Sequence, residues 1–141
     1  MFGDQPEKHE LLRKVPLFSD LTSKGLKEIA QIVDEVQQDA GSVLAQQGDM
    51  GQEFMFIVEG EARVEKDGNS INRLGPHDFF GEVSIIDLQP RTATVIAETN
   101  MKLLVVHSRH FRALIEKVPG LAIEVLTAVC KYLREAKAES I

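Results

Sequence analysis

The pattern of apolar and polar positions begins with helical periodicity. Four apolar residues follow the period of one helix face: Leu26, Ile29, Ala30 and Val33. This spacing predicts a helix from about Thr22, with Thr22 or Ser23 able to cap its start. A shorter helix is predicted from His9 to Lys14. We interpret these apolar faces as core packing.

From residue 35 the pattern changes to alternation and short buried runs, with glycines recurring between them. The predicted strands are residues 35–39, 43–46, 53–58, 61–66, 70–74, 94–98 and 101–107. The run Asp67-Gly68-Asn69 predicts a hairpin turn. Short strands with glycine turns favour a rolled sheet, a β-jelly-roll in a mainly β domain with flanking helices.

Helical periodicity returns after the last strand. One helix is predicted from about Arg109 to Lys117, capped by Ser108, and Pro119 separates it from a last helix of residues 121–138. An apolar stripe runs along this last helix: Ala122, Val125, Leu126, Val129 and Leu133. Such a stripe suits either the core of the domain itself or contact with another surface.

Composition narrows the class of protein. The chain has 141 residues, enough for one domain, and its net charge of −6 argues against a large nucleic-acid surface. The single Cys130 excludes an internal disulfide and suits a reducing compartment. No apolar run has the length of a membrane span, and the N-terminus has no signal-peptide core. We therefore expect a cytoplasmic protein whose partners include neither membrane nor nucleic acid.

The candidate chemistry lies between residues 80 and 95. Gly81 allows a sharp turn or a close approach to a ligand, and residues 82–88 can form one or two helical turns whose N-terminus attracts anions. Pro90 ends that turn, and Arg91 offers a planar guanidinium suited to phosphate. Ser84 and Thr92 add hydroxyl donors. The segment therefore predicts an anion cradle.

This segment resembles the phosphate-binding cassette of the cyclic nucleotide-binding domain family. The matching residues are Phe80, Gly81, Glu82, Ser84, Pro90, Arg91, Ala93 and Thr94. The resemblance implies a double-stranded β-helix fold with N-terminal helices and C-terminal lid or hinge helices. It implies that Glu82, next to Gly81, binds the ribose 2′-hydroxyl. It also implies that Arg91 pairs with the cyclic phosphate alongside the backbone near Val83 and Ser84.

The resemblance also bears on the rest of the chain. It divides one domain, residues 1–141, into an N-terminal helical part (1–34), a β-roll (35–107) containing the cassette (80–95), and C-terminal helices (108–141). His77 stands where glycine is common in the family. The shape of the loop at His77 is therefore the feature expected to differ from the family pattern.

The implied ligand is cAMP or cGMP, with no other cofactor. Thr92 follows Arg91 where cGMP-selective members contact the guanine amino group, but cAMP is the ligand we favour. The base needs an apolar cover, for which the last helix offers Val129, Tyr132 and Leu133, with Thr127 as a polar contact. Output would pass to an effector in trans, and a homodimer through the C-terminal helix is a second route.

Two other classes of function compete with a cyclic-nucleotide receptor. One is a structural or interaction module that keeps the fold without binding a ligand. The other is a cupin-type enzyme, which requires a His-X-His pair with a nearby Glu, and the four histidines (His9, His77, His107 and His110) form no such motif. No nucleophile motif is present, so we expect neither catalytic residues nor a metal site.

Overall fold

The computed structural model describes residues 6–15, 18–81 and 89–140, which group into two compact units. The β-rich unit runs from Val33 to His110. The helical unit combines residues 1–32 with residues 111–141.

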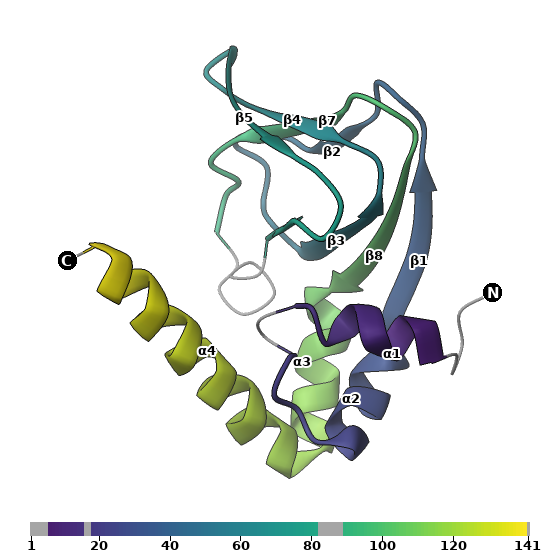
Figure 1. The fold of residues 1–141 in the computed structure, drawn as a ribbon, viewed down its shortest axis with the longest axis vertical. Coiled ribbons are helices and arrows are strands. Elements are labelled where there is room, and N and C mark those ends of the chain that lie inside the picture. The colour runs from purple at the N-terminus through teal and green to yellow at the C-terminus, as the bar shows by residue number, and fades with distance from the viewer. Residues whose placement is uncertain (1–5, 16–17, 82–88, 141) are drawn as a thin grey trace. The chain divides into compact units, whose positions relative to one another are not determined.

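The β-rich unit consists of two four-stranded antiparallel sheets (Figure 1). In chain order the strands are β1 (Val33–Gln38), β2 (Val43–Ala45), β3 (Glu53–Glu59), β4 (Ala62–Lys66), β5 (Asn69–Leu74), β6 (Phe79–Phe80), β7 (Thr94–Ala97) and β8 (Met101–His107). The order is β1-β8-β3-β6 in one sheet and β2-β7-β4-β5 in the other. Neighbours far apart in sequence, such as β3 and β8, therefore lie side by side, as a jelly roll requires.

Both sheets contribute to one buried cluster. Its members are Leu44, Ala45, Met55, Ile57, Ala62, Val95, Ala97, Met101, Leu103 and Val105. Burying a large aliphatic side chain stabilises a fold by about 1.5–3 kcal/mol, so this shared cluster holds the two sheets together. The strand predicted for residues 53–58 is confirmed, and Phe54 to Ile57 within it are buried, while Val58 is half-buried.

The turn between β4 and β5 has the conformation that its sequence predicts. Asp67 and Gly68 have φ angles of +53° and +82°, and Lys66 pairs with Asn69 across them. Positive φ at both central residues matches the right-handed twist of a hairpin, and Asp-Gly adopts it at low cost. The predicted hairpin is confirmed.

The segment before the candidate cassette contains a strand that the pattern did not predict. β6 has only two residues, Phe79 and Phe80, which pair with Phe56 and Met55 of β3, too few for alternation to be detected. Just before it, His77 has a φ of +73°, in the left-handed region that glycine adopts freely and histidine only rarely. Its main-chain N–H donates to the Ile57 carbonyl (2.7 Å) and its ring stacks on Phe56, so histidine keeps a glycine-like turn here.

The helical unit begins with α1 (Pro6–Leu12) and α2 (Ser23–Ala30). Thr22 caps α2 as predicted, its Oγ1 accepting from the Gly25 main-chain N–H (3.1 Å). The Thr22 N–H donates to the Glu124 carboxylate (2.8 Å), which suits the positive end of α2. The prediction that Val33 belongs to this helix is wrong, because α2 ends at Ala30 and Val33 pairs with Val106 as the first residue of β1.

The two C-terminal helices differ from the predicted ones in two respects. α3 (Ser108–Lys117) starts at Ser108 itself, and the Arg109 N–H donates to His107 Nδ1 (3.1 Å), so His107 takes the capping role assigned to Ser108. Along α4 (Pro119–Ser140) the buried residues are Leu121, Val125 and Ala128. Leu126 and Leu133, predicted to share one stripe with Val125, are 55% and 59% exposed, because they lie on another face of the helix.

Candidate functional site

The main chain around Arg91 is fixed by a neighbouring loop. The Arg91 N–H donates to the Asp49 carbonyl (2.7 Å), and the Gly48 N–H donates to the Arg91 carbonyl (2.9 Å). Met50 forms a β-bridge with Pro90. The loop at residues 48–51 therefore sets where the Arg91 side chain leaves the backbone.

The Arg91 guanidinium lies half-buried in the β-rich unit. Its Nη2 donates to the main-chain carbonyl of Glu53 (2.7 Å), and its Cζ lies 5.9 Å from the centre of the Phe80 ring. Burial lowers the pKa of Arg91, and the Glu53 carboxylate acts in the opposite direction. Because the ordinary pKa of arginine is far above neutrality, the group remains a cation and can attract an anion.

Gly81 is packed directly against this guanidinium. Its φ is +82°, and a Cβ placed there would overlap the Glu53 carbonyl oxygen and lie 2.6 Å from Arg91 Nη1. Glycine is required here for two reasons: the backbone is left-handed, and there is no room for a side chain.

The hydroxyl groups near Arg91 have different surroundings. Thr92 follows Arg91 in the chain and is exposed. Thr94, at the start of β7, is buried, and its Oγ1 accepts from the Gln47 main-chain N–H (2.9 Å) and from Gln46 Nε2 (3.3 Å). Thr94 thus fixes the loop before Gly48.

The predicted residues Glu82, Val83 and Ser84 lie outside the described residues, as does the expected helical turn at 82–88. Their proposed contacts to ribose and phosphate stay predictions.

Apart from Thr92, the predicted base contacts are on α4, in the helical unit. Thr127 Oγ1 donates to the Ile123 carbonyl within the helix (2.8 Å), and Val129 is half-buried. Leu133 is exposed and thus accessible to a ligand or a partner. Tyr132 belongs to the same helix, but its side chain is outside the described part.

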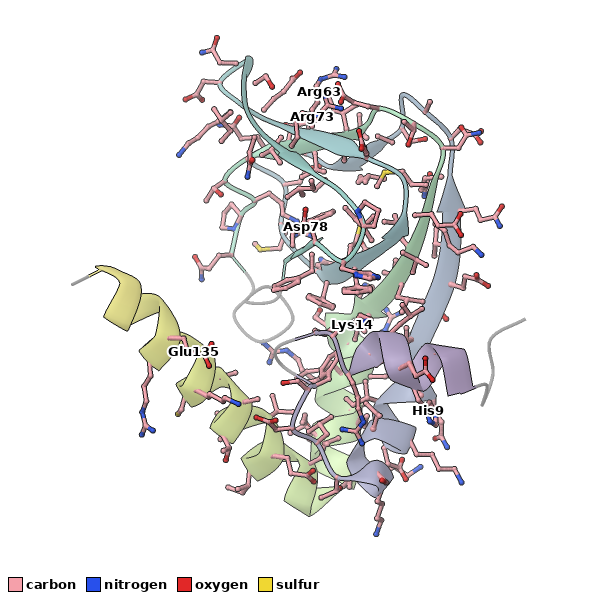
Figure 2. All side chains as sticks on the ribbon, in the orientation of Figure 1. His9, Lys14, Arg63, Arg73, Asp78 and Glu135 are labelled. Carbon is pink, nitrogen blue, oxygen red and sulfur yellow. The ribbon has the colours of Figure 1, made fainter. Side chains whose placement is uncertain are left out.

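Two other arginines of the roll, Arg63 and Arg73, form ion pairs; both side chains are labelled in Figure 2. Arg63 pairs with Glu65 (2.7 Å), and Arg73 pairs with Glu98 (2.7 Å) and Glu61 (3.0 Å). Arg73 is 63% exposed, whereas Arg91 is half-buried against main-chain groups and an aromatic ring. Arg73 therefore has the surroundings of a surface ion pair, whereas the Arg91 guanidinium is partly withdrawn from water.

The described ranges contain no group of three or more His, Cys, Asp or Glu side chains placed to hold a metal ion. The rings of His107 and His110 lie 5.8 Å apart, and the Nδ1 of His107 caps α3.

Sequence reasoning missed two of the groups that lie beside the Arg91 guanidinium. The Glu53 carbonyl belongs to the main chain, so no residue type marks it. Phe80 was part of the predicted motif, but its contact with Arg91 depends on how β6 pairs with β3. The sequence clue to this contact was the position of Phe80 directly before Gly81.

Comparison with known proteins decides the family. The family model described as "Cyclic nucleotide-binding domain" matches residues 35–118, more than half of the chain, and includes Gly81 and Arg91. The chain belongs to the cyclic nucleotide-binding domain family. The resemblance and the jelly-roll fold predicted from the sequence are thereby confirmed. The family is a regulatory binding domain, and a cyclic nucleotide is its ligand class.

Curated relatives of this cyclic nucleotide-binding domain are longer proteins. A cyclic nucleotide-gated potassium channel of Mesorhizobium japonicum is 38% identical over 85% of this chain. A cAMP-dependent protein kinase regulatory subunit of Schizosaccharomyces pombe is 37% identical over 82%. The chain spans 33% and 27% of the length of these two relatives.

Solved structures share the fold of this cyclic nucleotide-binding domain. The N-terminal domain of a transcriptional regulator from Streptomyces coelicolor A3(2) superposes with a TM-score of 0.82 at 31% identity, covering 93% of this chain and 95% of that one. Thermus thermophilus catabolite activator protein gives 0.67 at 28% identity, covering 88% of this chain and 61% of that one.

Within the described parts of this cyclic nucleotide-binding domain, no helix combines the length and apolar character needed to cross a membrane.

Proposed function

We propose that the chain is a receptor module in which Arg91 binds the phosphate of a 3′,5′-cyclic nucleotide. The observation that carries this proposal is the half-buried Arg91 guanidinium packed against Gly81, within the same cassette. Thr92 and the main chain at Val83 and Ser84 complete the phosphate contacts. Glu82 and the adjacent Gly81 hold the ribose.

The local electrostatics favour an anionic ligand despite the net charge of −6. A guanidinium in a partly desolvated site attracts a phosphate more strongly than an exposed one, because less water screens the charge. Its planar fork also matches two phosphate oxygens at once. A single such group suffices for a small ligand, whereas a nucleic acid requires an extended basic surface.

We further propose that ligand binding changes the C-terminal helices and that a partner senses this change. The named functions of the relatives support an effector, since one is a gated channel and another a kinase regulatory subunit. A ligand shifts such an equilibrium only if it binds one state more tightly than the other. Contacts from α4 to the base would supply that difference.

The competing interpretation is a module that keeps the fold without binding a ligand. Isothermal titration calorimetry with cAMP and with cGMP decides between the two, and we expect both to bind, with cAMP the tighter. If neither nucleotide produced heat on titration or displaced a fluorescent cyclic nucleotide analogue, the module without a ligand would be favoured.

The ribose contact gives the next expected result. A 2′-deoxy cyclic nucleotide should bind the wild-type chain about tenfold or more weaker, because Glu82 loses a charge-assisted hydrogen bond. Glu82→Gln should weaken the ribo ligand less than Arg91→Ala does, since an amide oxygen still accepts. The measurement is calorimetry on both chains. Equal affinity for the deoxy and ribo ligands would remove Glu82 from this role.

The exposed face of α4 can serve as a lid or as a dimer seam. Ile123, Leu126, Cys130 and Leu133 recur at spacings of three and four and are all exposed. That spacing fits a coiled-coil seam between two copies as well as an apolar cover for a purine. The two uses predict different consequences of shortening the helix.

We expect a chain cut after Lys131 to bind both nucleotides about tenfold more weakly, because apolar cover of the base is lost. This cut removes Tyr132 and Leu133 but keeps the buried Leu121 and Val125 and the ion pair of Lys131 with Asp20 (3.1 Å). A chain cut after Arg134, which keeps Tyr132 and Leu133, is the control for affinity. Unchanged affinity, with a fall in mass from dimer to monomer by sedimentation, would assign the face to dimerisation.

A further inference from the structure

The Phe80 ring lies beside the Arg91 guanidinium. The distance from Arg91 Cζ to the ring centre is 5.9 Å, within the range at which a cation is attracted to the face of an aromatic ring. Phe80 is half-buried and packs against the core cluster of the roll, and its strand pairs it with Met55 of β3. The ring is therefore held by the fold, independently of any ligand.

A second contact to the guanidinium comes from the same pair of strands. Arg91 Nη2 donates to the Glu53 carbonyl, at the start of β3, over 2.7 Å. The Arg91 main-chain N–H also donates to the Asp49 carbonyl. Arg91 is therefore restrained both at its backbone and at its guanidinium. Arginine has five N–H donors in a fixed fork, so the bond to the Glu53 carbonyl is compatible with contact to a phosphate.

We propose that Phe80 is a positioning residue that holds the Arg91 guanidinium ready for phosphate before the nucleotide arrives. This inference rests on the proposed phosphate-binding role of Arg91. A long flexible side chain loses rotamer freedom when it binds, and the ring removes part of that cost in advance. The ring also faces a partly desolvated cation, where attraction to an aromatic face is stronger than at an exposed site.

The deciding experiment is calorimetry with cAMP on Phe80→Leu, which keeps apolar bulk but removes the aromatic face. We expect affinity to fall about 3- to 10-fold, the fold-change of a partly desolvated cation–aromatic contact. Phe80→Tyr keeps the face and should bind within about twofold of wild type. The matched control is Phe79→Leu. The Phe79 ring packs against Phe54, with ring centres 5.8 Å apart, so this substitution should leave affinity unchanged.

A double-mutant cycle separates positioning from general damage to the fold. The affinity of the weakly binding Arg91→Ala chain is measured by competition at high nucleotide concentration. Adding Phe80→Leu to this chain should cause no further loss of affinity, because the guanidinium that Phe80 positions is already absent. An equal loss in both backgrounds, or a loss in Phe80→Tyr as large as in Phe80→Leu, would overturn the inference. So would wild-type affinity in Phe80→Leu. Failure of the wild-type chain to bind either nucleotide would instead overturn the proposed function, and the inference with it.

Discussion

Replacing Arg91 with alanine is expected to weaken cyclic nucleotide binding by about 2–4 kcal/mol, roughly 30- to 1000-fold. The phosphate would lose its charged partner in a partly desolvated site, where the charge is poorly replaced by water. The half-burial of Arg91 and its bond to the Glu53 carbonyl are the basis for this magnitude. Calorimetry with cAMP and cGMP on the folded variant measures it.

Two variants sharpen this result. Arg91→Lys should also lose affinity, because an ammonium is a point charge without the planar fork. Arg73→Ala removes an exposed arginine of the same unit, ion-paired with Glu98 and Glu61, and should bind as wild type. If Arg91→Ala bound as well as wild type while its thermal melting showed a folded chain, Arg91 would not be the phosphate ligand.

Titration of Arg91 is not expected to make cyclic nucleotide affinity depend on pH near neutrality. Burial lowers the pKa of Arg91, but the downward shift starts from a value far above neutrality. The guanidinium therefore stays protonated from about pH 6 to pH 8.

Gly81→Ala is expected to damage both stability and binding. Its φ of +82° disfavours any side chain, and the new Cβ would meet the Glu53 carbonyl oxygen and Arg91 Nη1. Strain and overlap together should lower the free energy of unfolding by about 2–4 kcal/mol. Because Arg91 would have to move, cyclic nucleotide affinity should fall by about tenfold or more. Urea denaturation and calorimetry measure the two effects.

Two other glycines provide matched controls for Gly81→Ala. Gly68 has the same φ of +82° but nothing within 4 Å of a new Cβ, so Gly68→Ala should cost only about 1–2 kcal/mol. At Gly60, with φ +101°, a Cβ would lie 2.6 Å from the Asn100 carbonyl, so Gly60→Ala should destabilise as much as Gly81→Ala but spare affinity in the folded fraction. Equal affinity losses in Gly60→Ala and Gly81→Ala would show that Gly81 acts through stability alone.

Local pattern was enough for most strands of the roll. Seven of the strands described here overlap the segments predicted from alternation, and the Asp67-Gly68 hairpin forms as its turn chemistry requires. The prediction failed where a strand was too short to show alternation, or where a strand residue also fitted the helical period. β6 has two residues, and Val33 continues the helical spacing of α2 although its main chain pairs with Val106 of β8. Long-range pairing outweighed the local period at Val33.

The sequence by itself determined the family and the rolled sheet and led to the prediction that Arg91 binds an anion, because residue types and spacing carry that information. Tertiary structure decided what surrounds Arg91: a carbonyl of Glu53 and the ring of Phe80, brought together by the pairing of β6 with β3. It also decided that Leu126 and Leu133 of α4 are exposed while Val125 is buried. The physical reason is that main-chain carbonyls have no residue signature, and that an amphipathic pattern does not specify which of two apolar faces becomes covered.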